Sequence, residues 1–216
     1  MESGIQYTKR EEIINTASHG FGVLLSLLGS IIMVIKAAHS HNITVIASTV
    51  IYGLAMIGMY AMSTLYHFVK PGRIKAVLRI FDHASIYILI AGCYTPVTLI
   101  LLGGTGKSLI MFAVVWAAAV IGIILNVVDM RRFKKIGMAL YLIMGWAAVA
   151  DISNIVTLLG TKGTALLVAG GAAYTVGVIF YRMKKIRYMH CIWHLFVLAG
   201  SVFHYLCVLN YIVPVF

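Results

Sequence analysis

The stretch HCIWHLFVLAGSVFHY occupies residues 190–205, near the C-terminal end of the sequence. His190 and His194 are four residues apart, so on a helix they share one face and lie about one turn apart. The residues that follow are almost all apolar, which predicts a helix that crosses a membrane. Imidazole is costly to bury there without a partner. The pair therefore indicates either half of a metal site, with zinc the commonest occupant, or two histidines that hydrogen-bond to neighbouring helices.

The composition of the whole chain extends this reading from one helix to the entire molecule. Of 216 residues, 62% are hydrophobic and only 11% are charged, which exceeds the apolar share of ordinary soluble domains. The three prolines and the lack of low-complexity sequence argue against linkers. We therefore expect one membrane domain over residues 1–216.

Apolar runs of 18 to 26 residues predict an all-α, seven-transmembrane helix bundle, since each run is long enough to cross about 30 Å of hydrocarbon. The short loops between the runs make consecutive helices antiparallel neighbours. A short interfacial helix is expected at about residues 5–18, and Pro96 is expected to kink the third span. The predicted spans are 20–38, 43–68, 80–102, 108–127, 136–158, 164–181 and 189–213.

The positive charges give this bundle an orientation. The net charge of +11 does not indicate nucleic acid, because the basic residues fall in short clusters between apolar runs, as they do beside membranes. Three of the 17 lie on the far side, at Lys36, Lys107 and Lys162. The other 14 lie on the side of the N-terminus: Lys9, Arg10, Lys70, Arg73, Lys75, Arg79, Arg131, Arg132, Lys134, Lys135, Arg182, Lys184, Lys185 and Arg187. The bias predicts a multi-pass protein of the cell membrane, with a cytoplasmic N-terminus and an external C-terminus.

This topology brings polar residues from distant parts of the sequence to one depth. His67 ends the second span and Asp82 opens the third, on the same side as His190 and His194. Ionisable groups that face a bundle interior are candidates for function. Three further residues open the first span there at helical spacing (i, i+3, i+7): Glu12, Asn15 and His19.

Three imidazoles and a carboxylate suit Zn²⁺, and three histidines with an open fourth position are typical of catalytic zinc. Asp82 would then act as general base, and Ser63, one turn before His67, would hold water or a substrate oxygen. The alternative for Asp82 is an ion pair with Arg79 or Arg73. For His83, which points about 100° away from Asp82 on a helix, we expect only packing, and for His204 hydrogen bonds within the bundle. Asn126 and Asp129 are expected to cap the end of span four, and Asp151 has no functional interpretation.

These residues, taken in order, resemble the hemolysin III proteins, the bacterial branch of the progestin and adipoQ receptor family. The resemblance rests on ExxNxxxH at 12–19, SxxxH at 63–67, Asp82, and HxxxH at 190–194, and covers nearly the whole chain. It implies that His67, His190 and His194 bind zinc and that Asp82 contacts a zinc-bound water. The superfamily includes alkaline ceramidases, and bacterial members were named for haemolytic, pore-forming behaviour.

Three functions follow as hypotheses. The first is a zinc-dependent hydrolase of lipid amide or ester bonds, with a membrane lipid as substrate and no nucleic acid partner. The second is a non-enzymatic protein: a receptor-like or membrane-homeostasis factor with structural zinc, or a pore-forming hemolysin. The third is ion or proton transport through the same histidines and aspartate. The spans carry few charges in their central thirds, which disfavours a pore.

Overall fold

The computed structural model describes residues 7–183 and 185–215, and the described chain is helical throughout. The α-helices are α1 (Lys9–Ala38), α2 (Ile43–Phe68), α3 (Arg73–Pro96), α4 (Gly106–Asp129), α5 (Lys134–Gly145), α6 (Ile152–Arg182) and α7 (Met189–Cys207). Short π-helical and 3₁₀ turns extend or join them: η1 (Val97–Leu101), η2 (Ala147–Asp151), η3 (Val208–Ile212) and η4 (Val213–Val215). The prediction of an all-α protein is confirmed.

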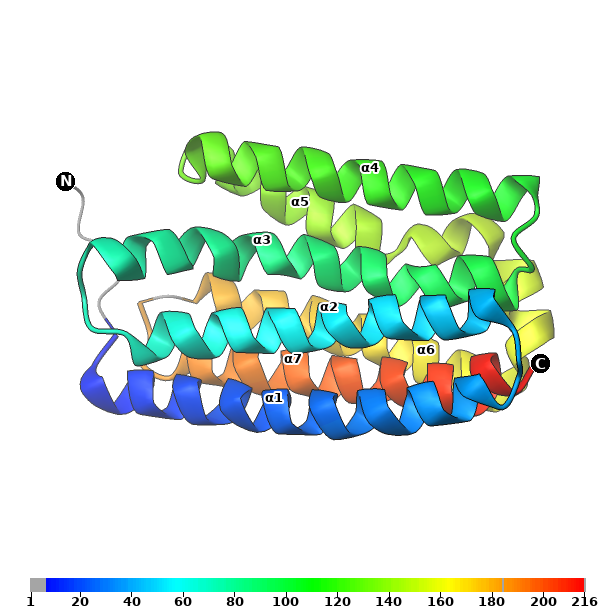
Figure 1. The fold of residues 1–216 in the computed structure, drawn as a ribbon. Helices are drawn as coiled ribbons and strands as arrows, with labels where there is room; N and C mark the ends of the chain where they lie inside the picture. Colours follow the sequence, from blue (N-terminus) through cyan, green and yellow to red (C-terminus); the bar gives the residue numbers. More distant parts are fainter. Residues whose placement is uncertain (1–6, 184, 216) are drawn as a thin grey trace.

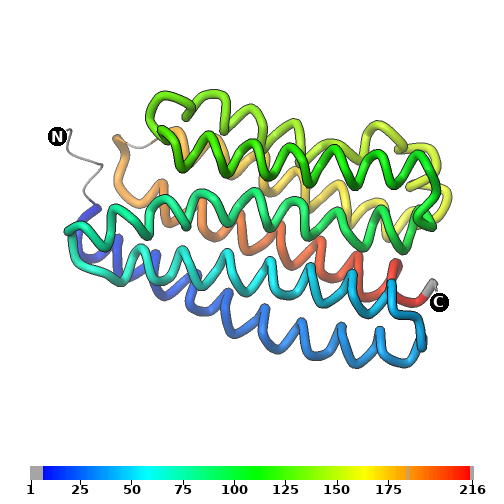
Figure 2. Tube along the Cα trace, turned by 45° about the horizontal axis from the view of Figure 1, so that its top comes forward, coloured from blue at the N-terminus to red at the C-terminus, as the bar shows by residue number. Residues whose placement is uncertain are grey.

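The helices form a single bundle with nearly parallel axes (Figure 1). α2 packs between α1 and α3, while α7 packs against both α1 and α6. α4 and α5 lie outside this group, where both pack against α3 and against each other. The described chain begins at one end of the bundle and finishes at the other (Figure 2).

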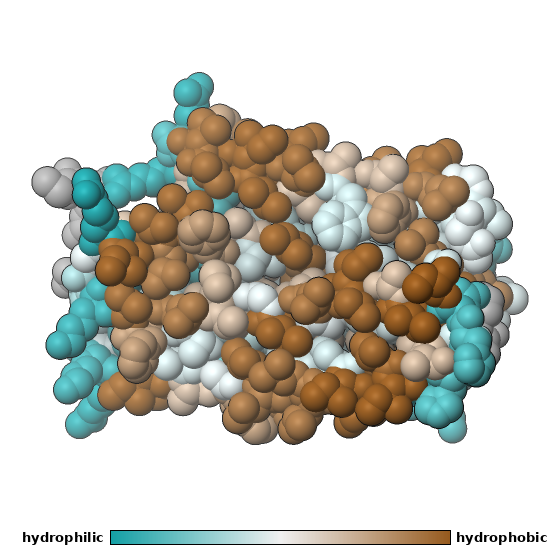
Figure 3. Space-filling model, in the orientation of Figure 1, coloured by the Kyte–Doolittle hydropathy of each residue, from teal (hydrophilic) through white to brown (hydrophobic). Residues whose placement is uncertain are grey.

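On the face shown in Figure 3, the surface of the bundle is mainly apolar along its middle and polar at its two ends. On α1, large apolar side chains such as Leu24 and Leu28 are 59% and 62% exposed, whereas Asn15 and His19 are buried. In a soluble protein the apolar side chains of a surface helix face the core and the polar ones face water, so the arrangement on α1 is the reverse. It is the distribution required in lipid, where apolar side chains face the hydrocarbon. The chain is a multi-pass membrane protein.

Six helical stretches are long and apolar enough to cross a membrane, against the predicted seven. The difference lies in one stretch of 49 residues, Lys134–Arg182, which contains α5, η2 and α6. Inside α6 the backbone leaves helical geometry at Gly160, with φ 63° and ψ −175°. Glycine tolerates this left-handed φ because it has no Cβ. Gly160 lies in LGTKG (159–163), where a turn between two spans is predicted.

Two local features differ from the expectation or refine it. Residues 9–38 form one continuous helix, so no separate interfacial helix precedes the first span within the described part of 5–18. Thr8 caps this helix in a capping box with Glu11, which starts it early. Pro96 ends the regular part of α3 and a π-helical turn follows, because proline has no N–H to donate to the preceding turn.

Candidate metal centre

His67, His190 and His194 meet at one end of the bundle, where the last turn of α2 lies beside the first turns of α7. His67 and His194 are 2% and 1% exposed. The Nε2 atom of His190 lies 3.3 Å from Nε2 of His67 and 3.1 Å from Nε2 of His194. The structure thus brings together three side chains that are up to 127 residues apart in the sequence. Each offers one possible metal-ligand atom, and these atoms lie within 4.8 Å of one another.

The spacing of these nitrogens fits a metal ion. Zinc–nitrogen bonds of about 2.0–2.1 Å in a tetrahedral arrangement place two ligand nitrogens about 3.3 Å apart. The two Nε2 separations agree with that value. Within the described part of the chain the group contains three histidines and no fourth ligand. The arrangement therefore suits a metal with one coordination position left open to a small molecule.

Glu12 holds the ring of His67 from its other side. Its Oε2 lies 2.6 Å from Nδ1 of His67, and its Oε1 lies 2.8 Å from Nζ of Lys75. Nδ2 of Asn15 also approaches the same His67 nitrogen, at 3.4 Å. A carboxylate that accepts the Nδ1–H of a histidine fixes the tautomer and directs the Nε2 lone pair at a metal. Glu12 accepts from this nitrogen and Asn15 lies beside it, while the supporting roles of Glu12, Asn15 and His19 toward a metal stay a prediction.

Ser18 contacts the outer nitrogen of His194, as Glu12 contacts that of His67, and the sequence did not predict this contact. The Ser18 hydroxyl donates to the backbone oxygen of Asn15 at 3.0 Å, and its Oγ lies 3.2 Å from Nδ1 of His194. Because the hydroxyl proton is already used, Nδ1–H of His194 is the donor of the second bond. Its Nε2 lone pair is then free to face the other two rings. Ser18 lies one turn from Asn15 on α1, but serine is too common for its position alone to indicate this role.

Tyr7 covers His190 on the side away from the membrane centre. The two rings are stacked, with centroids 4.7 Å apart and planes at 24°, and Tyr7 also lies against His67 with centroids 5.7 Å apart. Burial raises the pKa of the Tyr7 phenol well above its ordinary value, so the hydroxyl stays protonated at neutral pH. Tyr7 precedes α1 in an extended segment, and no periodic pattern in the sequence indicates its contact with the site.

Glu11 fastens the start of α1 to the start of α7. Its Oε1 accepts the backbone N–H of Tyr188 at 2.8 Å, while Oε2 accepts the N–H and hydroxyl of Thr8. Tyr188, the N-cap of α7, has a left-handed φ of 64°. Such a φ is unfavourable for a side chain with a Cβ, so the bond to Glu11 supports it. The capping-box pattern at 8–11 was a readable signal for Glu11, whereas its bond to Tyr188 was not.

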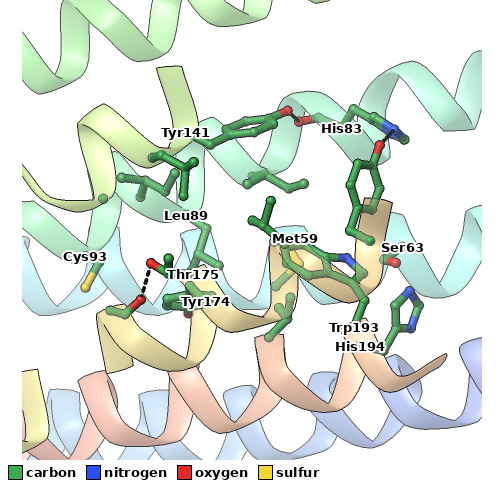
Figure 4. Close-up of a pocket in the computed structure, with 18 of the residues that line it drawn as sticks. Met59, Ser63, His83, Leu89, Cys93, Tyr141, Tyr174, Thr175, Trp193 and His194 are labelled. Atoms are coloured by element: carbon green, nitrogen blue, oxygen red, sulfur yellow. Dashed lines mark hydrogen bonds between the residues drawn. The ribbon is translucent and has the colours of Figure 1, made fainter. Parts of the chain in front are cut away.

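Asp82 and Ser63 lie next to the histidines at the edge of a cavity of about 120 Å³. Figure 4 shows Ser63 and His194 at one end of this cavity and Cys93 at the other. His190 and His19 also line it. Ser63 is buried, and Oδ2 of Asp82 lies 3.2 Å from Nδ1 of His83. The two residues predicted to be catalytic therefore share the cavity with two of the three metal-ligand candidates.

The cavity extends from the histidines toward the middle of the bundle, between α3, α5, α6 and α7. Its walls are mainly apolar and aromatic, with Met59, Leu89, Val197 and Trp193 among them. A second hollow of about 40 Å³ continues past Trp146, which is 39% exposed on the outer surface. α5 packs mainly against α3 and α4, and side chains of α5 and α6 both line the cavity. The cavity therefore has polar and ionisable side chains at the histidine end and apolar walls beyond them.

Three polar residues outside the cluster have structural partners. His204 makes hydrogen bonds within the bundle and Asp129 contacts the end of α4, as predicted, whereas Asn126 bonds to α3 instead of capping α4. Both nitrogens of His204 are used: Nε2 lies 3.1 Å from the backbone oxygen of Leu167, and Nδ1 lies 3.3 Å from Sγ of Cys93. Asp129 accepts the backbone N–H groups of Arg131 and Arg132 at the end of α4, while Asn126 donates to the backbone oxygen of Ile80.

Asp151 and His83 make contacts that the sequence did not predict. Asp151 had no interpretation; its Oδ1 lies 2.6 Å from Nζ of Lys107 and it also accepts from Asn154, at the opposite end of the bundle. His83 was expected only to pack. It faces the cavity, where it lies beside Asp82 and 3.3 Å from the hydroxyl of Tyr181.

Comparison with known proteins agrees with this geometry. Residues 7–205 match the family described as "Haemolysin-III related". Hemolysin-3 of Bacillus cereus is 40% identical over 206 residues, covering 95% of this chain and 93% of its own, and a hemolysin-3 homolog of Bacillus subtilis is 41% identical over 97% and 98%. The human monocyte to macrophage differentiation factor is 27% identical over 94% of this chain and 84% of its own. With the residues of the resemblance gathered at one end of a helical membrane bundle, the chain belongs to the haemolysin-III family.

Proposed function

We propose that this protein is a zinc-dependent hydrolase of lipid amide or ester bonds that works within the membrane, at the cytoplasmic leaflet. The observation that carries the proposal is that Nε2 of His190 lies at metal-site spacing from Nε2 of both His67 and His194, beside an apolar cavity that Asp82 and Ser63 also line. Zinc supplies, when bound, the polarisation of a carbonyl group and a water of pKa near 7.

The protein side chains would supply the remaining steps. Asp82 accepts the proton of the attacking water and delivers it to the leaving nitrogen or oxygen, as the bond to the carbonyl carbon breaks. The Ser63 hydroxyl donates to an oxygen of the substrate. The apolar walls around Leu89 and Val197 hold the acyl chain and exclude other water. The products are a fatty acid and an amine or alcohol.

The test is the release of fatty acid from ceramide and phospholipid vesicles by purified protein in the metal-loaded form. We expect Asp82→Asn to retain its zinc and to lose activity by at least about 100-fold, the usual contribution of a general base. Asp129→Asn, at the same end of the bundle but outside the site, is the control and should remain active. Full activity of the Asp82 variant, or no fatty acid released from any of these lipids by the parent, would reject the proposal.

A structural metal or a pore is the alternative, and the names of the hemolysin-3 relatives favour the pore. A pore needs a polar path across the bundle, whereas the cavity beneath the histidines is lined mainly by apolar side chains. A structural zinc site has four protein ligands, whereas the described group offers three. Dye leakage from vesicles that contain the protein, without any lipid cleavage, would favour the pore instead.

We also propose seven membrane crossings, with the N-terminus in the cytoplasm. The stretch Lys134–Arg182 has 49 residues, or about 74 Å as a helix, which is more than twice the hydrocarbon thickness of about 30 Å. The break at Gly160 divides it into two lengths that each suffice for one crossing. Fourteen Lys and Arg residues on one side support the orientation.

Labelling of single cysteines in intact cells tests this topology. Lys162 is exposed just after the break, and Arg132 and Lys185 are exposed near the two ends of the stretch. In a background without Cys93, Cys191 and Cys207, we expect Lys162→Cys to react with an impermeant maleimide from outside. Arg132→Cys and Lys185→Cys should react only after the cells are permeabilised. Labelling of all three from the same side would contradict two crossings.

A further inference from the structure

His19 is a buried histidine beside the metal centre whose ring nitrogens make no hydrogen bond to any residue that the structure describes. It is 3% exposed, on the face of α1 that points into the bundle. Neither Nδ1 nor Nε2 makes a hydrogen bond among the described residues. Buried imidazoles normally have their polar atoms satisfied, as those of His204 are. His19 also lines the cavity next to Asp82 and Ser63, so a molecule in the cavity can reach it.

The contacts of His19 fix the plane of its ring without using its nitrogens. The ring is stacked on His194, with centroids 3.6 Å apart and planes at 13°. It meets Tyr60 nearly at right angles, with centroids 5.1 Å apart and an angle of 89°. Tyr60 is itself held by a bond of 2.7 Å from its hydroxyl to Oγ of Ser201. The protein therefore holds this imidazole in one orientation, which is the condition for precise hydrogen bonding to a ligand.

His19 does not belong to the metal-ligand group. That group, as far as the described residues go, comprises His67, His190 and His194. Because the ring of His19 lies parallel to that of His194, the in-plane lone pairs of the two rings do not aim at a common point. His19 is therefore a polar group beside the metal position rather than a fourth ligand.

We propose that His19 is a further substrate-binding residue, whose imidazole N–H donates a hydrogen bond to the acyl oxygen of an acyl lipid. This rests on the proposed function, since it assumes an acyl chain in the apolar part of the cavity. An ionised carboxylate such as Asp82 offers only acceptors, so the donors available for the carbonyl oxygen of a substrate are the Ser63 hydroxyl on α2 and the His19 imidazole on α1. A donor that is already oriented stabilises this oxygen most when negative charge develops on it.

The experiment measures binding and metal content rather than turnover. The probe is radiolabelled laurate, a carboxylate with an acyl chain, and its dissociation constant is measured with metal-loaded protein in phosphatidylcholine nanodiscs. His19→Phe keeps a ring for stacking and removes both nitrogens, whereas His19→Gln restores a donor. His39→Phe, an exposed histidine at the other end of the bundle, is the matched control.

We expect His19→Phe to retain the parent's metal content and to bind laurate at least about tenfold more weakly, as loss of one strong hydrogen bond implies. His19→Gln should recover most of that affinity, and His39→Phe should match the parent. Loss of metal in His19→Phe would make His19 a ligand and overturn the proposal. Unchanged laurate binding in His19→Phe, with or without a lower melting temperature, would overturn it by leaving His19 a packing residue only. The binding assay does not depend on turnover. A parent without hydrolase activity would therefore reject the proposed function, while the comparison of laurate binding would still decide the role of His19.

Discussion

His204 and the cluster of His67, His190 and His194 differ in where their ring nitrogens point. His204 gives one nitrogen to a backbone oxygen on α6 and faces a thiol on α3 with the other. In the cluster, Nδ1 of His67 and Nδ1 of His194 contact Glu12 and Ser18, while the Nε2 atoms face one another. A histidine whose two nitrogens both have protein partners is satisfied by the fold alone. Lone pairs that converge repel one another, and a cation between them removes that repulsion.

The largest expected effect separates these two groups directly. His67→Ala should abolish the binding of one metal ion per chain, with an affinity loss of at least about 100-fold, because two imidazoles alone make a weak site. His204→Ala should retain the metal, although it loses two buried contacts and stability. Metal content by mass spectrometry and melting with and without a chelator provide the measurements. Equal metal content in the two variants would remove the distinction.

The second effect tests whether the Nδ1 partners matter for the metal. Glu12→Ala removes the carboxylate on His67 and should weaken metal affinity by about 10–100-fold, the usual effect of losing such a partner. Glu12 also pairs with Lys75, so Lys75→Met is the control for loss of that ion pair. Competition with a chelator of known affinity measures both. If Lys75→Met weakens the metal as much as Glu12→Ala does, the ion pair and not the contact to His67 carries the effect.

Glu11 should affect the stability of the bundle more than the metal. Glu11→Ala removes the bond to Tyr188 and the capping box, and we expect it to lower the unfolding free energy by about 1–2 kcal/mol. Thr8→Ser, which keeps the capping hydroxyl, should be close to the parent. Thermal unfolding of metal-loaded and metal-free protein measures both. A destabilisation seen only with metal bound would instead assign Glu11 to the metal centre.

The smallest effect concerns Ser18. Ser18→Ala leaves Nδ1 of His194 without its acceptor and should weaken metal affinity by about 2–10-fold, the equivalent of one ordinary hydrogen bond. Ser26 makes the same kind of bond to the backbone three residues earlier on α1, away from the histidines. Ser26→Ala should therefore leave the affinity unchanged. An equal loss in both serine variants would point to a general change in α1.

The lengths of the apolar runs predicted most of the helices, because the bilayer sets the length of a crossing helix, while the orientation predicted from the charge bias stays a prediction. α2 and α4 begin and end within two residues of the predicted spans, and α7 begins where predicted and continues through η3 and η4 to the predicted end. The count of spans differed where Gly160 interrupts a helical stretch without ending its hydrogen-bonding pattern. The N-terminal helix was expected to be separate from the first span, but the capping box at Thr8 and Glu11 starts one helix that continues through both.

The residues of the site were predictable to the extent that they lie at membrane-imposed depths and helical spacings. Their contacts were not. Ser18, Tyr7 and the bond from Glu11 to Tyr188 join elements far apart in the sequence, and no spacing within one helix indicates which atoms meet. His83 was read as a packing residue because it points away from Asp82 on an ideal helix, yet the two side chains approach to 3.2 Å.

The sequence by itself determined that this protein is a helical membrane bundle with polar residues at one end, since hydrocarbon accepts only such helices and tolerates ionisable groups only in the interior. The tertiary structure decided that the imidazoles of three histidines meet, and that His19 lines a cavity with neither ring nitrogen hydrogen-bonded to the described residues. The reason is physical: helical period and membrane depth fix the height and side of a residue, but the rotation and packing of one helix against another fix which atoms touch.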